Sequence, residues 1–234
     1  MFDGKSIMGI IPARYGSKRL PRKNVLPLGN KPLIAWTIEA AKKSKYIDRT
    51  YVSTESKIIK NIALKYGADV PFLRPKRLAN DTTPTIDVIL HFIGQLEKRN
   101  IYYDYLILLQ PTSPLRTKKH IDESIEMLIQ KNADGIISIT KTNHPIEFTN
   151  ELPENLSLDN FLDPRVIDKR AQDFPDRYHI NGAIYLGKVK RILNEKSFVY
   201  RDKVYAYKMS RKSSIDIDEN LDLQFAAHLI SKNQ

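Results

Sequence analysis

Short apolar runs alternate with longer amphipathic stretches along most of the chain. Runs that are rich in β-branched residues and lack alternating polar positions predict buried strands. These runs lie at 7–13, 50–54, 105–109, 135–139, 182–186 and 204–209.

Between these runs, apolar positions recur every three or four residues, which is the spacing of an amphipathic helix. The helical stretches lie at 32–41, 57–66, 84–98, 121–129 and 221–229. Pro32 suits the first turn of its helix, and Gly67 suits a helix end. In the last stretch, Leu221, Phe225 and Leu229 form the apolar stripe.

Repeated strand–helix units predict an α/β fold, with a mostly parallel sheet and helices on both of its faces. Ligands bind such sheets beyond the carboxyl ends of the strands, which draws attention to the loops at 12–24 and 110–117. The alternation of strand-like and helix-like stretches is interrupted at 141–178 by prolines and mixed charge. Apolar residues such as Phe148 and Phe161 remain in this segment. We interpret this stretch as an inserted subdomain within a single domain that spans 1–234.

Composition narrows the possible classes of protein. The 234 residues include no cysteine, which excludes disulfides, thiolate metal sites and a cysteine nucleophile. The first residues lack the apolar stretch of a signal peptide, and no segment approaches the roughly 20 apolar residues that span a bilayer. We therefore expect a cytoplasmic protein with no membrane partner.

The net charge of +11 raises the possibility of nucleic-acid binding, but its distribution argues against it. Residues 14–23 hold five cations and no acid, whereas the other cations are scattered among acidic residues. A positive electrostatic potential concentrated at one loop suits a compact polyanion such as a nucleoside triphosphate. A nucleic-acid binder spreads its cations along a groove. The alternative is that the loop is simply a flexible, solvated stretch of charged residues.

The basic loop follows the first strand and precedes a helix, which directs backbone N–H groups toward an anion. Within it, Arg14 and Lys18 suit phosphate oxygens, Ser17 suits a hydrogen bond to one, and Lys23 suits another phosphate. The loop lacks both the Walker pattern and the G-x-G-x-x-G spacing. Neither an ATPase nor a dehydrogenase is indicated.

Two further positions carry candidate chemistry. At strand spacing, the alternating residues 215–218 place Asp216 and Asp218 on one face, where their hard oxygens suit Mg²⁺. The alternative is that Asp218 caps the last helix. Gln110 stands where an apolar strand stops, and its amide can both donate to and accept from a polyhydroxy ligand. The following Arg116 is expected to charge the rim, while the alternative for Gln110 is a loop residue that bonds the backbone.

These segments together resemble the CMP-sialic acid synthetase (N-acylneuraminate cytidylyltransferase) family. Its pattern after the first strand is matched by Ile11, Pro12, Ala13, Arg14, Ser17, Lys18, Pro21, Lys23 and Asn24. Further matching blocks lie at 29–34, 74–81, 109–116, 181–185 and 215–218.

The resemblance implies a Rossmann-like fold of the nucleotide-diphospho-sugar transferase type. It assigns the nucleotide to Arg14, Ser17, Lys18, Lys23, Asn24 and Arg74. It assigns the acidic sugar to Gln110, with Arg170, Tyr178 and Asn181 as further candidates, and catalytic Mg²⁺ to Asp216 and Asp218. The insertion at 141–178 would build a homodimer.

The implied reaction forms a CMP-sugar from CTP and a nine-carbon sugar acid and releases pyrophosphate. Its catalytic set would be Arg14, Lys18, Lys23, Asp216 and Asp218. N-acetylneuraminic or legionaminic acid is the expected substrate, because pseudaminic acid enzymes typically depart from the block at 181–185. A 3-deoxy-manno-octulosonate cytidylyltransferase and a catalytically inactive sugar-nucleotide binder are the alternatives.

Overall fold

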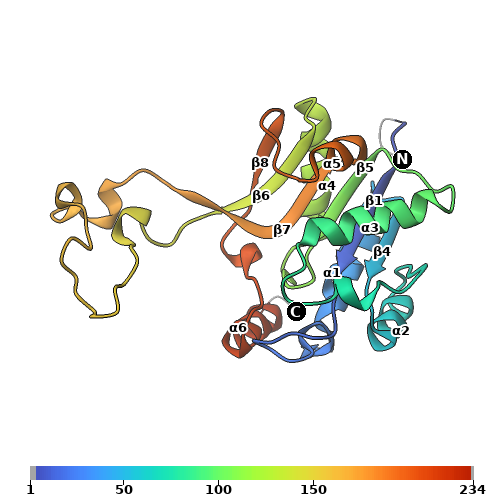
Figure 1. Cartoon of the computed structure of the whole chain (residues 1–234), viewed down its shortest axis with the longest axis horizontal. Coiled ribbons are helices and arrows are strands. Elements are labelled where there is room, and N and C mark those ends of the chain that lie inside the picture. Colours follow the sequence, from blue (N-terminus) through green and yellow to red (C-terminus); the bar gives the residue numbers. More distant parts are fainter. Residues whose placement is uncertain (1–3, 233–234) are drawn as a thin grey trace.

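The computed structural model describes residues 4–232, and a six-stranded sheet in the order β4-β1-β5-β7-β6-β8 lies at its centre (Figure 1). The strands are β1 (Ile7–Pro12), β4 (Arg49–Ser53), β5 (Tyr105–Leu109), β6 (Gly135–Lys141), β7 (Tyr178–Lys188) and β8 (Val204–Lys208). The short β2 (Pro27–Leu28) and β3 (Lys31–Pro32) pair separately. All six predicted strands are present.

Strand direction decides which loops meet. β1 pairs in parallel with β4 and β5, and β6 pairs in parallel with β8, whereas β7 runs against both β5 and β6. The mostly parallel sheet is therefore confirmed. Because β1, β4 and β5 end at the same edge, the residues that follow them meet there. The reversed β7 brings its first half to that edge, with Ile184 opposite Leu109.

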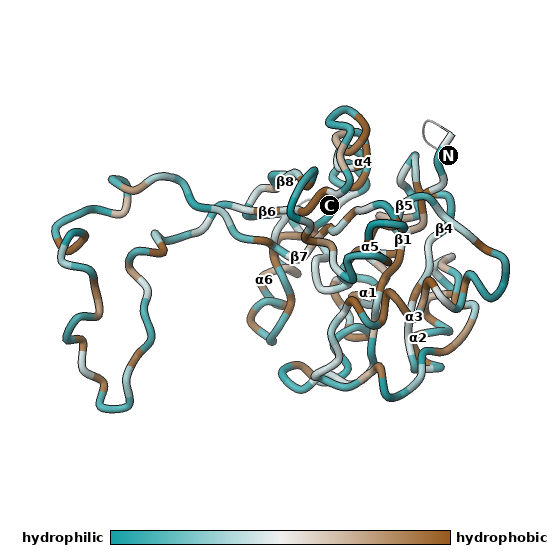
Figure 2. Tube along the Cα trace, turned by 45° about the horizontal axis from the view of Figure 1, so that its top comes forward, coloured by the Kyte–Doolittle hydropathy of each residue, from teal (hydrophilic) through white to brown (hydrophobic). Residues whose placement is uncertain are grey.

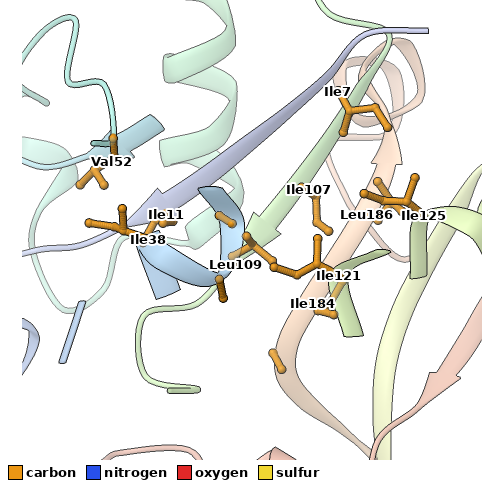
Figure 3. Close-up of a cluster of buried hydrophobic side chains, with 14 of the residues drawn as sticks. Ile7, Ile11, Ile38, Val52, Ile107, Leu109, Ile121, Ile125, Ile184 and Leu186 are labelled. Carbon is orange, nitrogen blue, oxygen red and sulfur yellow. The ribbon is translucent and has the colours of Figure 1, made fainter. Parts of the chain in front are cut away.

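Helices cover both faces of the sheet, as predicted. They are α1 (Leu33–Lys42), α2 (Lys57–Lys65), α3 (Thr85–Glu97), α4 (Lys118–Gln130) and α5 (Val189–Glu195). On one face, α1 and α4 bury Ile38 and Ile125 against the strands (Figure 3). Helix α2 buries Ile59 in the same core. On the other, α3 and α5 bury Phe92 and Ile192. Within residues 4–232, no helix combines the length and apolar content needed to cross a membrane.

The last helix, α6 (Asn220–Ser231), forms as predicted but packs by a different face. Leu221 and Phe225 are exposed, whereas Ala226 and Ile230 are buried beside Leu28 in a separate small core. The predicted stripe was wrong because the helix packs through the face that carries Ala226 and Ile230. This small core joins the region of β2 to the carboxyl-terminal part of the chain.

An arm of residues 142–177 connects β6 to β7 and extends away from the sheet (Figure 1). Its regular structure is limited to the 3-10 turns Ile146–Phe148, Pro164–Val166 and Ala171–Asp173. Hydrophobic and hydrophilic positions are mixed along its whole length (Figure 2). The arm corresponds to the break in rhythm predicted at 141–178.

Candidate active site

A crevice of about 480 Å³ lies at the edge where β1 and β5 end. It is lined by most of the predicted site residues, namely Arg14, Ser17, Lys18, Lys23, Asn24, Arg74, Gln110 and Asp218. Cavities of about 520 and 650 Å³ lie elsewhere; Arg116 lines the larger one, but neither is lined by a residue assigned to the nucleotide, the sugar or the metal. The chemistry of the lining therefore identifies the smaller crevice as the candidate site.

The first two cations of the basic loop share one carboxylate across the crevice. Arg14 and Lys18 both form ion pairs with Asp81, with Lys18 Nζ 3.0 Å from its Oδ2. Asp81 lies in the turn between the 3-10 helix Lys76–Leu78 and α3. The hydrogen bond from Arg14, followed by that from Lys18, lowers the pKa of Asp81. The carboxylate is therefore ionised at neutral pH.

Asn24 and Arg74 hold the basic loop in position through hydrogen bonds. The buried Asn24 donates its amide N–H to the Arg14 carbonyl at 2.8 Å. Arg74 is also buried, and it donates to Glu55 at 3.2 Å while Glu55 accepts the Tyr15 N–H at 2.7 Å. Burial lowers the pKa of Arg74. Sequence reasoning missed Glu55, although an acid directly after the strand at 50–54 was a usable signal.

The segment that carries the two aspartates reaches the same crevice from the carboxyl-terminal end. Ile217 is fully buried in the small core beside Leu28, and its N–H donates to the Thr112 carbonyl at 2.8 Å. This anchor sets Lys23 Nζ 3.0 Å from Asp218 Oδ1 and lets the same ammonium contact the Ile217 carbonyl. The two cations Lys23 and Arg19 thus share Asp218, with Arg19 at 2.9 Å.

One expectation about this segment needs correction, and one alternative is wrong. Residues 215–218 form no strand and pair with no strand of the described chain. Asp218 does not cap α6, because Glu219 is the N-cap and Asp222 accepts the N–H groups of Asp218 and Glu219. Asp218 instead forms ion pairs with the cations Arg19 and Lys23 of the basic loop.

Asp216 differs from Asp218 in having no ion-pair partner among residues 4–232. Asp216 is exposed and does not line the crevice, yet nearby protein displaces enough water to raise the pKa of its carboxyl group. The hydrogen bond from the Thr112 side chain and the charge of Lys23 oppose that shift, while the charge of Asp218 adds to it. The protein alone therefore compensates the charge of Asp216 only in part.

Of the four residues predicted to bind the sugar, Gln110 alone lines the crevice. Gln110 lines the crevice, and its side chain lies over Gly182, where a Cβ would stand 3.2 Å from Gln110 Oε1. Gly182 has a φ of +76°, so both its conformation and the close approach favour glycine.

The prediction that Arg116 charges the rim was wrong. Arg116 is fully buried, where it donates to the carbonyls of Gln110 at 3.0 Å and Ala183 at 2.9 Å. Burial lowers its pKa to about 9. Its role is to join the end of β5 to the middle of β7 behind Gln110.

Arg170, Tyr178 and Asn181 do not line the crevice. Arg170 lies on the arm, paired with Asp173 at 3.0 Å, and Tyr178 begins β7. The buried Asn181 accepts from the Ser138 hydroxyl at 2.6 Å and donates to the Ser214 hydroxyl at 2.8 Å. It anchors the chain just before Asp216. Sugar contacts by these three residues remain a prediction.

The geometry brings the cations of the basic loop and Asp218 into one concave site, while Asp216 lies outside the lining of that site. A family model for cytidylyltransferases matches residues 8–233. The chain belongs to the cytidylyltransferase family.

Curated relatives of this cytidylyltransferase act on three different sugar acids by name. A pseudaminic acid cytidylyltransferase of Campylobacter jejuni is 36% identical, covering 96% of each chain. A CMP-N,N'-diacetyllegionaminic acid synthase of Legionella pneumophila is 35% identical, covering 97% of each. An N-acylneuraminate cytidylyltransferase of Escherichia coli is 38% identical over 97% of this chain and 52% of its own.

A solved structure confirms the fold type. CMP:2-keto-3-deoxy-manno-octonic acid synthetase, complexed with CTP, superposes with a TM-score of 0.72 and covers 98% of this chain and 100% of its own. Its sequence identity is 16%, so the likeness concerns the fold.

Replacing Asp216 by Asn should stabilise the metal-free protein at neutral pH. A raised pKa means that the folded state binds the proton more tightly than the unfolded state, so the ionised carboxylate opposes folding at neutral pH. We expect thermal unfolding in EDTA to occur a few degrees higher for the variant. The gain should shrink as pH falls through the raised pKa, where the wild-type carboxyl is protonated.

Asp218→Asn is the matched control, because it removes a carboxylate that is paired with Lys23 and Arg19. It should not raise the unfolding temperature. A lower unfolding temperature for Asp216→Asn at pH 7 would contradict the assigned electrostatics.

Proposed function

We propose that this cytidylyltransferase transfers CMP from CTP to a nine-carbon sialic-type sugar acid and releases pyrophosphate. The observation that carries the proposal is the contact of the basic loop with Asp218, on the segment that also carries Asp216, at one edge of the sheet. Membership of the cytidylyltransferase family supplies the nucleotide, and the sugar acids named for its relatives supply the acceptor class.

We assign the triphosphate to the side of the crevice that the basic loop lines. The cationic donors on this side belong to Arg14, Lys18 and Lys23, and Ser17 adds a hydroxyl. Charge-assisted bonds from such donors to phosphate are stronger than neutral ones. Asn24 and Arg74 act less directly than expected, since both hold the loop in position.

Asp216 and Asp218 fit a Mg²⁺ ion. No cluster of three acidic or histidine side chains able to hold a metal occurs within residues 4–232, so the protein would supply two carboxylates. Mg²⁺ is often held in this way, by one or two carboxylates together with substrate phosphates and water. The charge of Asp216, which Lys23 and Thr112 compensate only in part, suits such a ligand. When bound, Mg²⁺ would neutralise phosphate charge and lower the pKa of the attacking hydroxyl.

Catalysis by the chain's own residues rests on positioning and charge. The anomeric hydroxyl of the sugar acid attacks the α-phosphorus in line, forming the new P–O bond while the bond to pyrophosphate breaks. Arg14, Lys18 and Lys23 stabilise the negative charge that builds on the leaving group. Gln110, fixed by the Arg116 contacts behind it, orients the acceptor. No covalent enzyme intermediate is required.

The acceptor is one of the sialic-type acids, with N-acetylneuraminic or legionaminic acid as our first choice on the block at 181–185. Pseudaminic acid stays a strong alternative, because the relatives named for the three sugars have identities of 36%, 35% and 38%. An eight-carbon acid is the next alternative. Pairing of the loop cations with Asp81 and Asp218 weighs against nucleic acid.

Pyrophosphate release tests the activity directly. The chain should release pyrophosphate from CTP and Mg²⁺ with at least one of N-acetylneuraminic, legionaminic and pseudaminic acid, and far more slowly with UTP or ATP. Asp216→Asn should lower kcat by about a hundredfold or more, as loss of a group that stabilises the transition state does. Asp159→Asn, which changes an exposed acid of the arm, is the control.

Release with none of these acids, nor with an eight-carbon acid, would remove the proposed function. Full activity of Asp216→Asn at saturating Mg²⁺ would remove its metal assignment while leaving the reaction standing.

We also propose that the arm makes the protein a homodimer. Its apolar residues Ile146, Leu152, Leu156, Leu158 and Ile167 are each more than half exposed. Exposed apolar residues gathered on one projecting segment are characteristic of an interaction surface. A second copy of the chain is the partner that the family resemblance implies. Such pairing could also bring Arg170 toward the crevice of the other subunit.

The double change Leu158→Asp with Ile167→Asp should separate the dimer, because it places charge on the surface to be buried. Light scattering should give twice the 27.0 kDa chain mass for the wild type and about the chain mass for the variant. Leu64→Asp on α2 alters an apolar residue of similar exposure away from the arm and should leave the dimer intact. A wild-type mass of 27.0 kDa would contradict the proposal.

A further inference from the structure

Four of the five cations of the basic loop already have a carboxylate partner. Arg14 and Lys18 pair with Asp81, while Arg19 and Lys23 pair with Asp218. Asp218 has a second task in the proposed reaction, as a metal ligand. Asp81 has none, although it lines the crevice.

Asp81 makes long-range and solvent-accessible contacts. It stands 67 positions from Arg14, and about a third of the surface of each of these side chains is exposed. Lys18 is largely exposed as well. Ion pairs of this kind stabilise a protein little and exchange readily. A stronger anion can therefore replace Asp81 without disturbing the fold.

A bound polyphosphate needs the donors that Asp81 now occupies. If the proposed function holds, the β- and γ-phosphates of CTP approach Arg14 and Lys18 and carry several negative charges. A carboxylate left in contact with those cations would repel the phosphates at short distance. Arginine binds phosphate in bidentate fashion more strongly than it binds one exposed carboxylate oxygen.

We propose that Asp81 is a resident counter-ion of the polyphosphate site, which gives way to CTP and returns as pyrophosphate leaves. The inference rests on the proposed function and adds an affinity-determining residue to it. By competing for Arg14 and Lys18, Asp81 weakens the binding of both polyphosphates. Weaker binding of pyrophosphate speeds its release after transfer.

The competing interpretation is that Asp81 only positions Arg14 for the substrate. The two interpretations predict opposite signs. Loss of a counter-ion tightens polyphosphate binding, whereas loss of a positioning contact weakens it. Magnitudes favour the counter-ion, because an exposed ion pair orients its partners weakly while repulsion acts on every charge of the polyphosphate.

Calorimetric titration with pyrophosphate and Mg²⁺ shows whether loss of the Asp81 charge tightens or weakens polyphosphate binding. This measurement does not require turnover. Asp81→Asn keeps the size of the side chain and removes its charge, and it should bind pyrophosphate and CTP about tenfold more tightly than the wild type. The gain should diminish at high salt. In turnover, pyrophosphate should become a stronger inhibitor, and kcat should fall or stay level while the KM for CTP falls.

Two variants serve as controls. Asp81→Glu keeps the charge and should bind pyrophosphate within about threefold of the wild type, as a counter-ion on a longer stem would allow. Asp69→Asn removes the exposed pair with Arg49 away from the crevice and should change nothing.

Equal or weaker binding of pyrophosphate by a folded Asp81→Asn protein would overturn the inference. Should that variant fail to fold, tighter binding by Asp81→Ser would support the counter-ion, and unchanged or weaker binding would overturn it. Absence of CTP binding by the wild type would instead reject the proposed function, so the two failures are distinguishable.

Discussion

The contact between Lys23 and Asp218 is the constraint on which the site depends. These residues lie 195 positions apart, yet their side chains meet at 3.0 Å. The contact exists because Ile217 is buried in the small core beside Leu28, which fixes the acidic segment against the basic loop. A short apolar anchor thus places charges of both signs at the mouth of one crevice.

The sheet supplies the rest of the geometry. Loops that follow β1, β4 and β5 meet because those strands are parallel, and they contribute the cations, Glu55 and Gln110. β7 enters from the opposite direction, so Gly182 leaves space for the Gln110 side chain. Buried Arg116 joins the end of β5 to the middle of β7 by donating to the carbonyls of Gln110 and Ala183. Positioning of the reactants therefore rests on rigid elements.

Much of the fold follows from hydrophobic patterning, because buried strands and one-sided helices have distinct periods. The strand at 105–109 matches β5, and the helix ending at Gly67 matches α2. Short α5 was not predicted, since it buries only Val189 and Ile192. The buried face of α6 was not predictable either, because its partner Leu28 lies almost two hundred residues away.

The site was predictable where motif residues face the crevice and not where they support it. Arg14, Lys18, Lys23 and Asp218 are gathered as expected. Asn181 belongs to the same motifs but does not line the crevice, and Asn24 lines it while its amide, like that of Asn181, bonds a neighbouring part of the chain. Whether a motif residue faces a ligand or its neighbours depends on tertiary contacts that one sequence does not reveal.

The most direct measurement is a crystal structure of the chain soaked with CTP and Mg²⁺ in the absence of sugar. The account predicts one triphosphate whose oxygens contact Arg14 and Lys23 and also ligate a metal held by Asp216 and Asp218. A triphosphate bound away from either group, or a metal bound elsewhere on the protein, would contradict it.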